Sequence, residues 1–193
     1  YYNLNYKYLE DIPFIPAELF KDIDLLSIDK KRIFKIMTSS GTGSNKLSRI
    51  FLDRETARIQ IKVLSKLMNS NISKKRLPML IIDTPKVMKK RLEFSARVAG
   101  ILGFTLFGKD ITYALDDNMN LNLEAIDKFQ NRYSNQKTII FGFTFIVWEY
   151  FLVALKKSKI NLRLDSSILL HGGGWKKLTD INMSNQEFKD QIK

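Results

Sequence analysis

The chain has 193 residues, of which 45% are hydrophobic and 11% aromatic, so it can bury the core of one domain or somewhat more. It contains no cysteine and a single histidine, which excludes disulfides, thiolate metal sites, a thiol nucleophile and a multi-histidine metal centre within these residues. The formal charge of +12 favours an anionic partner: nucleic acid, an acidic membrane face or a polyphosphate ligand.

The basic residues are spread along the chain instead of forming one arm. Their short clusters are Lys30-Lys31-Arg32, Lys74-Lys75-Arg76, Lys89-Lys90-Arg91, Lys156-Lys157 and Lys176-Lys177. This distribution favours a solvated, lysine-rich surface over a nucleic-acid face, and we expect no nucleic-acid partner. The absence of cysteine is compatible with a reducing compartment, and we expect a cytoplasmic protein.

The first 31 residues are predicted to form an extended lead-in, because Pro13 and Pro16 cannot join a central sheet ladder. We place a single α/β domain over residues 32–193. It begins with a strand predicted over residues 32–37, which leads into a loop rich in hydroxyl groups and glycine.

That loop, residues 38–46, reads Thr-Ser-Ser-Gly-Thr-Gly-Ser-Asn-Lys and has the chemistry of a phosphate cradle. Gly41 and Gly43 let backbone N–H groups turn toward an anion, and Lys46 adds a positive charge. Hydroxyl donors come from Ser39, Ser40, Thr42 and Ser44. The same composition is normal in a flexible hairpin turn, so both interpretations stay open. A Walker P-loop does not fit, because a second strand is predicted over residues 48–52 where that motif requires a helix.

Further along, strands alternate with helices, which predicts an α/β fold: a mixed, largely parallel sheet with helices on both faces. Asp53 is placed to cap a helix whose apolar residues are Ala57, Ile61, Leu64 and Met68. Strands are expected at residues 80–83, within 104–115, at 138–143 and at 167–170; helices are expected at residues 93–102 (ended by Gly103), at 123–133, at 145–157 and from a capping box at 184–187.

The apolar run of 17 residues at 139–155 contains Glu149 and is shorter than the roughly 20 residues of a membrane-spanning helix. We predict a buried strand followed by a buried helix, and no transmembrane segment.

The strand at residues 167–170 runs into His171-Gly172-Gly173-Gly174-Trp175-Lys176. Three glycines at the carboxyl end of a strand leave room for a flat ligand against bare backbone, where ligands sit in open α/β sheets. A wide turn is the alternative. A lone histidine is more often a hydrogen-bonded turn or core residue than a catalytic base, and Trp175 can equally serve packing.

Three stretches resemble the LuxE-type acyl-protein synthetases, a branch of the adenylate-forming (acyl-CoA synthetase-like) superfamily. They are the proline-rich residues 11–21, the loop 38–46, which is similar to the superfamily's phosphate loop, and Leu170-His171-Gly172-Gly173-Gly174-Trp175-Lys176, which is similar to its adenine-side glycine segment. The resemblance covers roughly residues 10–180.

The resemblance implies ATP- and Mg²⁺-dependent activation of a carboxylic acid, typically a fatty acid, as an acyl-adenylate. The acyl group would then pass to a thiol of an acceptor protein such as a reductase or carrier. By motif position, the β/γ-phosphates would be held by Ser39, Ser40, Gly41, Thr42, Gly43, Ser44 and Lys46. The adenine would be bordered by Gly172, Gly173 and Gly174. His171 would lie near the acyl carboxylate or α-phosphate and, with Lys46, act in catalysis; no metal-binding residue is predicted.

Members of that family continue beyond this point through a mobile C-terminal domain that carries a catalytic lysine and the acyl-accepting cysteine. We therefore expect these residues to be the N-terminal portion of an adenylate-forming enzyme, inactive alone and able to bind nucleotide weakly. Two other classes stay open: a basic α/β module that binds nucleotide, nucleic acid or a carrier protein without chemistry of its own, and a membrane-associated assembly factor.

Overall fold

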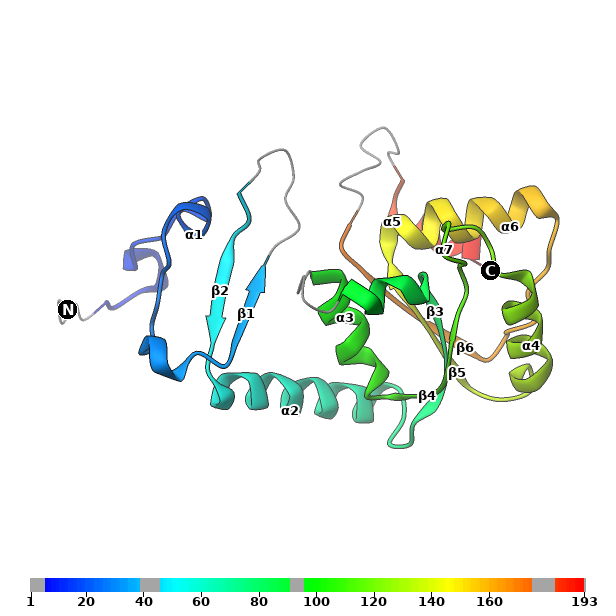
Figure 1. Cartoon of the computed structure of the whole chain (residues 1–193), viewed down its shortest axis with the longest axis horizontal. Coiled ribbons are helices and arrows are strands. Elements are labelled where there is room, and N and C mark those ends of the chain that lie inside the picture. The colour runs from blue at the N-terminus through cyan, green and yellow to red at the C-terminus, as the bar shows by residue number, and fades with distance from the viewer. Residues whose placement is uncertain (1–5, 39–45, 91–95, 175–182, 193) are drawn as a thin grey trace. The chain divides into compact units, whose positions relative to one another are not determined.

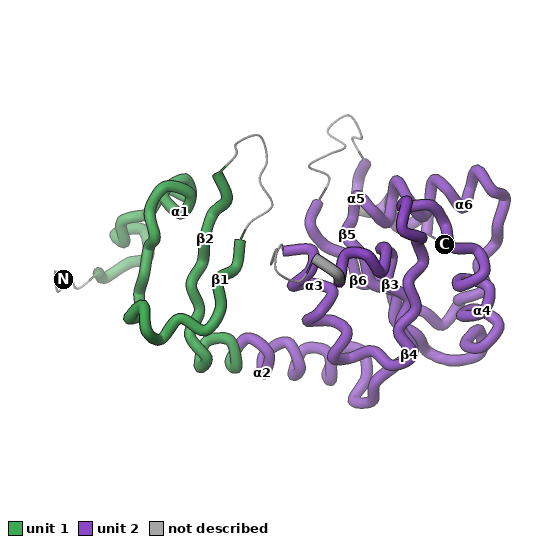
Figure 2. Tube along the Cα trace, in the orientation of Figure 1, with its two compact units in different colours: residues 1–59 green, residues 60–193 purple. Residues whose placement is uncertain are grey.

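The computed structural model describes residues 6–38, 46–90, 96–174 and 183–192, and its contacts divide the chain into two compact units, Tyr1–Ile59 and Gln60–Lys193 (Figure 2). The α/β domain predicted from the sequence includes residues 32–59, whereas the contacts group these residues with the N-terminal ones. The predicted boundary near residue 31 stays a prediction. Among the described residues no helix is long and apolar enough to cross a membrane.

Unit 1 is built around an antiparallel hairpin. Strands β1 (Lys35–Thr38) and β2 (Arg49–Leu52) pair with Lys35 opposite Leu52 and Thr38 opposite Arg49. Both predicted strands are confirmed, and the loop between them joins two paired strands as expected. Short helical turns precede the hairpin at Leu9–Asp11, Leu19–Asp22 (α1) and Lys30–Arg32.

Helix α2 (Arg54–Asn71) begins where the sequence predicts, directly after Asp53. The Asp53 carboxylate accepts the backbone N–H of Thr56 at 2.8 Å, which satisfies one of the free donors of the first turn. This hydrogen bond contributes most to the lowered pKa of the Asp53 carboxyl group.

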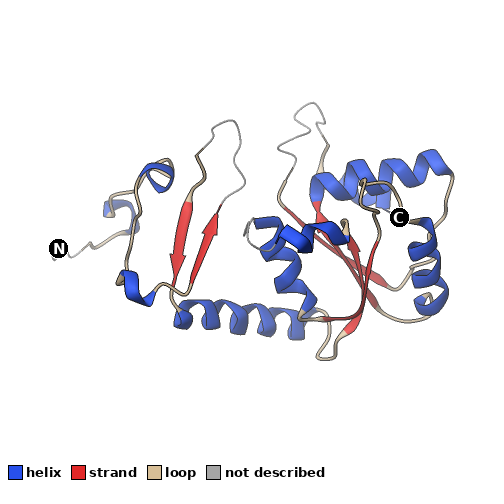
Figure 3. Ribbon diagram, viewed as in Figure 1, coloured by secondary structure: helices blue, strands red, loops and turns tan. Residues whose placement is uncertain are grey.

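Unit 2 holds a parallel sheet of four strands in the order β4-β3-β5-β6, which confirms the predicted α/β class (Figures 1 and 3). The strands are β3 (Leu77–Ile82), β4 (Gly108–Tyr113), β5 (Thr138–Phe143) and β6 (Ser167–Gly172). The helices are α3 (Ala96–Thr105), α4 (Leu123–Tyr133), α5 (Thr144–Ile146), α6 (Val153–Ser158) and α7 (Asn185–Ile192), with a 3-10 segment at Pro85–Lys90 and a π-helical segment at Val147–Leu152.

The central strand β3 is buried on both faces, as expected for a parallel sheet covered by helices. Leu80 and Ile82 join one core cluster with α4, the helix after β5, and α7, whereas Met79 and Ile81 join a second with α2 and α3. Helices therefore cover both faces, as the sequence predicted.

Several predicted boundaries are shifted: strand 32–37 is observed at Lys35–Thr38 and strand 80–83 at Leu77–Ile82. Two further shifts have a clear physical reason. Helix α3 continues through Gly103 to Thr105, because Phe104 stacks on Phe141 with ring centroids 4.4 Å apart and this packing outweighs the roughly 1 kcal/mol helix penalty of glycine. Strand β6 continues past Leu170 through Gly172, because β5 offers it partners: Gly142 pairs with His171 and Phe143 with Gly172.

The helix after β5 runs from Thr144 to Ser158 without a break and packs closely on the sheet. A Cβ at Gly142 would lie 2.7 Å from Val147 Cγ2 and 2.9 Å from Ile82 Cβ, so only glycine allows this approach.

We predict that Gly142→Ala lowers the free energy of unfolding by ~1–3 kcal/mol, because the added methyl group has no space in a packed core. Gly103→Ala is the control: no atom of the described residues lies within 4 Å of its added Cβ, and in a helix we expect a gain of ~0.5–1 kcal/mol. Urea unfolding followed by circular dichroism measures both. Equal stabilities for Gly142→Ala and the parent chain would contradict the close packing.

Candidate ligand site at the carboxyl edge of the sheet

The carboxyl ends of β3 and β5 lie side by side, and the chain leaves them in opposite directions. After β3 it passes through α3 to β4 on one side, and after β5 through a helix to β6 on the other side (Figure 1). Open α/β sheets bind ligands at such a switch point, outside the carboxyl ends of the strands. The polar residues at this edge are therefore the first candidates for a site.

At the end of β3, the Asp83 carboxylate is buried and fully engaged. Only 1% of the residue is exposed; Arg97 Nε donates to its Oδ2 at 2.7 Å and the Thr84 N–H donates to its Oδ1 at 2.6 Å. A second guanidinium nitrogen of Arg97 bonds the other carboxylate oxygen. A buried carboxylate needs such partners because desolvation is costly. A third of the Arg97 side chain stays exposed. Its guanidinium, held in place by Asp83, therefore presents a positive charge at the carboxyl edge.

At the end of β5, Thr144 joins the start of the helix to the end of β6. Its side-chain oxygen lies 3.0 Å from His171 Nδ1 and 3.0 Å from the carbonyl oxygen of Gly172. Thr144 itself is 4% exposed, and the His171 ring lies 4.9 Å from the ring of Phe188 in α7. One hydroxyl therefore joins the start of this helix to the end of β6, and the His171 ring in turn contacts α7.

His171 is an exposed residue, and the partial desolvation of its ring lowers its pKa from the ordinary value of 6.5. At neutral pH the imidazole is therefore mostly uncharged. A neutral imidazole has one N–H donor and one acceptor nitrogen, so its chemistry depends on which nitrogen holds the proton.

The three glycines after His171 differ in what they require. Gly173 has φ +95, and a Cβ there would lie 2.9 Å from Phe143 Cδ1; Gly174 has φ +63. Gly172 has neither constraint: among the described residues nothing lies within 4 Å of an added Cβ, and its φ is not in the left-handed region. Packing and backbone conformation explain the second and third glycines, but they leave the first unexplained.

An apolar cavity of about 440 Å³ lies on the face of β5 and β6 that the helix after β5 covers. Its lining is Ile140, Val147, Phe151, Leu152, Leu162, Leu164, Asp165, Ser167, Leu169 and Ile192. Except for one carboxylate and one hydroxyl, these side chains are aliphatic or aromatic, which suits a hydrocarbon group.

Of the residues predicted to bind phosphate, Ser39, Ser40, Gly41, Thr42, Gly43 and Ser44 lie outside the described residues, as does Trp175. Lys46 is described, and its Nζ lies 2.7 Å from Asp22 Oδ1 in an exposed ion pair within unit 1. Such surface pairs contribute about 0–1 kcal/mol, so an anionic ligand can replace Asp22. His171, Gly172, Gly173 and Gly174 stand together at the end of β6.

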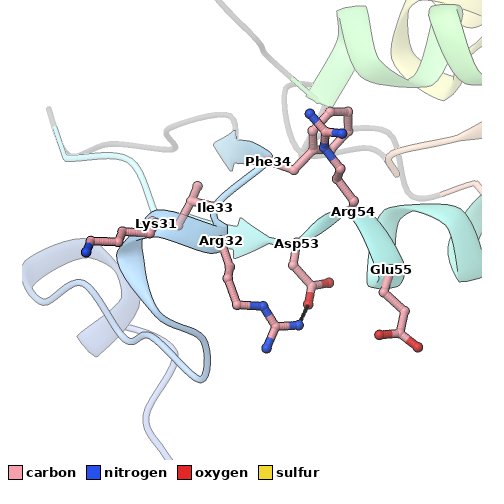
Figure 4. Close-up of a pocket in the computed structure, with 7 residues that line it drawn as sticks. All are labelled: Lys31, Arg32, Ile33, Phe34, Asp53, Arg54 and Glu55. Carbon is pink, nitrogen blue, oxygen red and sulfur yellow. Dashed lines mark hydrogen bonds and ion pairs between the residues drawn. The ribbon is translucent and has the colours of Figure 1, made fainter.

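Unit 1 contains a shallow hollow of about 630 Å³ beside the start of α2, lined by Lys31, Arg32, Ile33, Phe34, Asp53, Arg54 and Glu55 (Figure 4). Its polar groups are largely paired with one another. Arg32 donates to Asp53 at 3.1 Å, and the Arg54 guanidinium lies 5.4 Å from the centre of the Phe34 ring. Lys31 and Glu55 point away from the Arg32–Asp53 pair (Figure 4). These contacts organise the helix start, and we assign no ligand to the hollow.

Thr144, Arg97 and the role of Asp83 were not predicted from the sequence. The sequence could have identified Asp83 and Thr144 as site candidates, because each follows directly on a buried strand. Polar residues at that position face the carboxyl edge of a parallel sheet. Arg97 gave no such signal, since only the fold brings it to Asp83. Among the described residues no group of three or more His, Asp and Glu could hold a metal ion.

Unit 2 is thus an open parallel α/β sheet with polar groups at its switch point, which is where such folds bind ligands. A family model described as "Acyl-protein synthetase, LuxE" matches residues 3–193. The chain therefore belongs to the LuxE acyl-protein synthetase family, which implies acyl-protein synthetase activity in general. Searches of the curated proteins and of the solved structures gave no match.

We predict that proton NMR places the pKa of His171 below 6.5, and the assignment is unambiguous because the chain has one histidine. The folded state favours the neutral ring, so protonation costs stability. The stability contribution of His171 is fully present above the unfolded pKa of about 6.5 and is lost as the pH falls through the lower folded value.

Urea titrations at several pH values test this linkage. His171→Gln should lose stability less steeply than the parent chain between neutral pH and the folded pKa. Parallel curves for the two proteins, or a pKa at or above 6.5, would contradict the desolvation of the ring.

Proposed function

We propose that this protein activates a fatty acid with ATP and transfers the acyl group to a protein thiol. An acid carboxylate attacks the α-phosphorus of ATP, forming an acyl-adenylate and releasing pyrophosphate. A thiolate of the acceptor protein then attacks the acyl carbonyl, so that a thioester forms and AMP leaves. The observation that carries the proposal is the bare backbone of Gly172 at the carboxyl edge, in a chain of the LuxE family.

Gly172 supports the nucleotide part of the proposal because neither its backbone conformation nor packing against the described part of the chain explains its lack of a side chain. A flat base can approach backbone that carries no Cβ. By the family resemblance, Gly172, Gly173 and Gly174 are proposed to border the adenine, and the loop residues 39–44 with Lys46 are proposed to bind the phosphates.

Mg²⁺ fits this scheme as a partner of the phosphates. It is commonly bound through one or two carboxylates together with substrate phosphates, so a dedicated cluster of protein ligands is not needed. When bound, it would neutralise negative charge on the leaving pyrophosphate. Backbone N–H groups and hydroxyls of the loop would assist in the same way.

The apolar cavity beside β5 and β6 supports a fatty acid as the substrate. Val147, which lines it, is three residues past Thr144, so the cavity wall begins close to the carboxyl edge. We propose that the carboxylate stays at that edge and that the hydrocarbon chain enters the cavity.

The protein that contains this chain is expected to exchange labelled pyrophosphate into ATP when a fatty acid and Mg²⁺ are present. Gly172→Val should weaken ATP binding at least about tenfold, because the added side chain fills the space proposed for the base. Calorimetric titration measures binding, and Gly103→Ala serves as a control glycine substitution away from the site. Retained ATP binding without exchange over a panel of carboxylic acids would favour the non-catalytic binding module.

Leu164→Phe should shift the preference toward shorter acids, because the larger ring reduces the cavity. Each methylene that loses its burial costs about 0.8 kcal/mol, or roughly fourfold in kcat/KM for the longer acid. Leu106→Phe is the matched control: Leu106 is 53% exposed and does not line the cavity. An unchanged chain-length profile for Leu164→Phe would place the acyl chain elsewhere.

A further inference from the structure

The Thr144 hydroxyl has two neighbours but only one proton. Its oxygen lies 3.0 Å from His171 Nδ1 and 3.0 Å from the carbonyl oxygen of Gly172. A carbonyl oxygen can only accept, so the hydroxyl proton goes to Gly172. The His171 Nδ1 must then donate a proton of its own to the Thr144 oxygen.

We propose that Thr144 is a positioning residue that holds His171 in the Nδ1–H tautomer, so that Nε2 offers its lone pair to an N–H donor of the bound substrate. The inference about the tautomer stands on the hydrogen bonds alone. The identity of the donor rests on the proposed function. Because the folded protein favours the uncharged ring, the Nε2 lone pair is available at neutral pH.

The surroundings of Thr144 keep its hydroxyl in this arrangement. The residue is 4% exposed, so the hydroxyl has little access to solvent. Pairing of Phe143 with Gly172 in the sheet keeps the Gly172 carbonyl beside it. The His171 ring, in turn, packs against Phe188 at 4.9 Å, which restricts its rotation.

The tautomer decides which substrate group His171 can face. A nitrogen lone pair attracts a hydrogen-bond donor and repels an anionic oxygen. His171 is therefore poorly suited to the acyl carboxylate or the α-phosphate, where the family resemblance would place it. On an adenine nucleotide the exocyclic amino group is the donor that fits best, because the bare backbone of Gly172 next to His171 is proposed to border the base.

The first experiment measures the tautomer directly by ¹⁵N NMR of the imidazole, at a pH above the His171 pKa. One histidine gives one pair of ring-nitrogen signals, and we expect a protonated Nδ1 and an unprotonated Nε2. Thr144→Val removes the acceptor and should shift the population toward Nε2–H, whereas Thr144→Ser keeps the hydroxyl and should restore the parent pattern.

Two results would overturn the tautomer assignment: a protonated Nε2 in the parent chain, or the same pattern in Thr144→Val as in the parent. Thr144→Ser substitutes the same buried position but keeps the hydrogen bonds. It therefore separates the effect of losing the hydroxyl from a general effect of substitution on the structure. This experiment needs no nucleotide, so its outcome does not depend on the proposed function.

The second experiment compares binding of ATP with that of purine riboside triphosphate, which lacks the exocyclic amino group. We expect the parent chain and Thr144→Ser to prefer ATP by about fivefold to tenfold, as for one hydrogen bond, and Thr144→Val to lose most of this preference. Equal binding of both nucleotides to the parent chain would overturn the assignment of the donor. If neither nucleotide binds, the donor assignment and the proposed function fail together, while the NMR result for the tautomer stands.

Discussion

Burial of the central strands on both faces is the constraint on which the rest of unit 2 depends. Met79, Leu80, Ile81 and Ile82 have no exposed surface, and β5 beside them is nearly as buried. Helices on the two faces leave little place for a polar side chain within these strands, and the buried Thr138 at the start of β5 is satisfied by a hydrogen bond with Ser167 of β6. Polar groups therefore gather where the strands end, and at the carboxyl edge these are Asp83, Thr84, Thr144 and His171.

Close packing around Phe143 then determines which glycines are structural. A Cβ at Gly100 would lie 3.1 Å from this ring, and one at Gly173 would lie 2.9 Å from it, while Gly142 allows the following helix to approach. The run of three glycines after His171 thus combines three roles: Gly173 serves packing, Gly174 serves a left-handed backbone, and Gly172 is proposed to face the ligand.

Hydrogen bonding at the end of β5 gives the single histidine a defined chemical character. In water, a neutral imidazole exchanges freely between its two tautomers. In the folded protein, the imidazole, the Thr144 hydroxyl and the Gly172 carbonyl are all satisfied when Nδ1–H donates to the hydroxyl and the hydroxyl donates to the carbonyl. The inferred role of His171 changes accordingly, from contact with an anionic centre to recognition of a donor, and the charge stabilisation that acyl-adenylate formation needs would come from other groups.

The sequence alone determined the local elements and the family, since both depend on residues close together in the chain. Helix 123–133 and strand 138–143 were predicted with their observed bounds, and the Asp53 cap and the capping box of Ser184 and Glu187 are confirmed. Only the tertiary structure decided the strand order, the continuation of α3 through Gly103, the Asp83–Arg97 pair and the bond between Thr144 and His171, 27 residues apart. Hydrophobic periodicity reports which face of an element is buried, but it carries no information on which elements become neighbours. The polar contacts of the site depend on those neighbours.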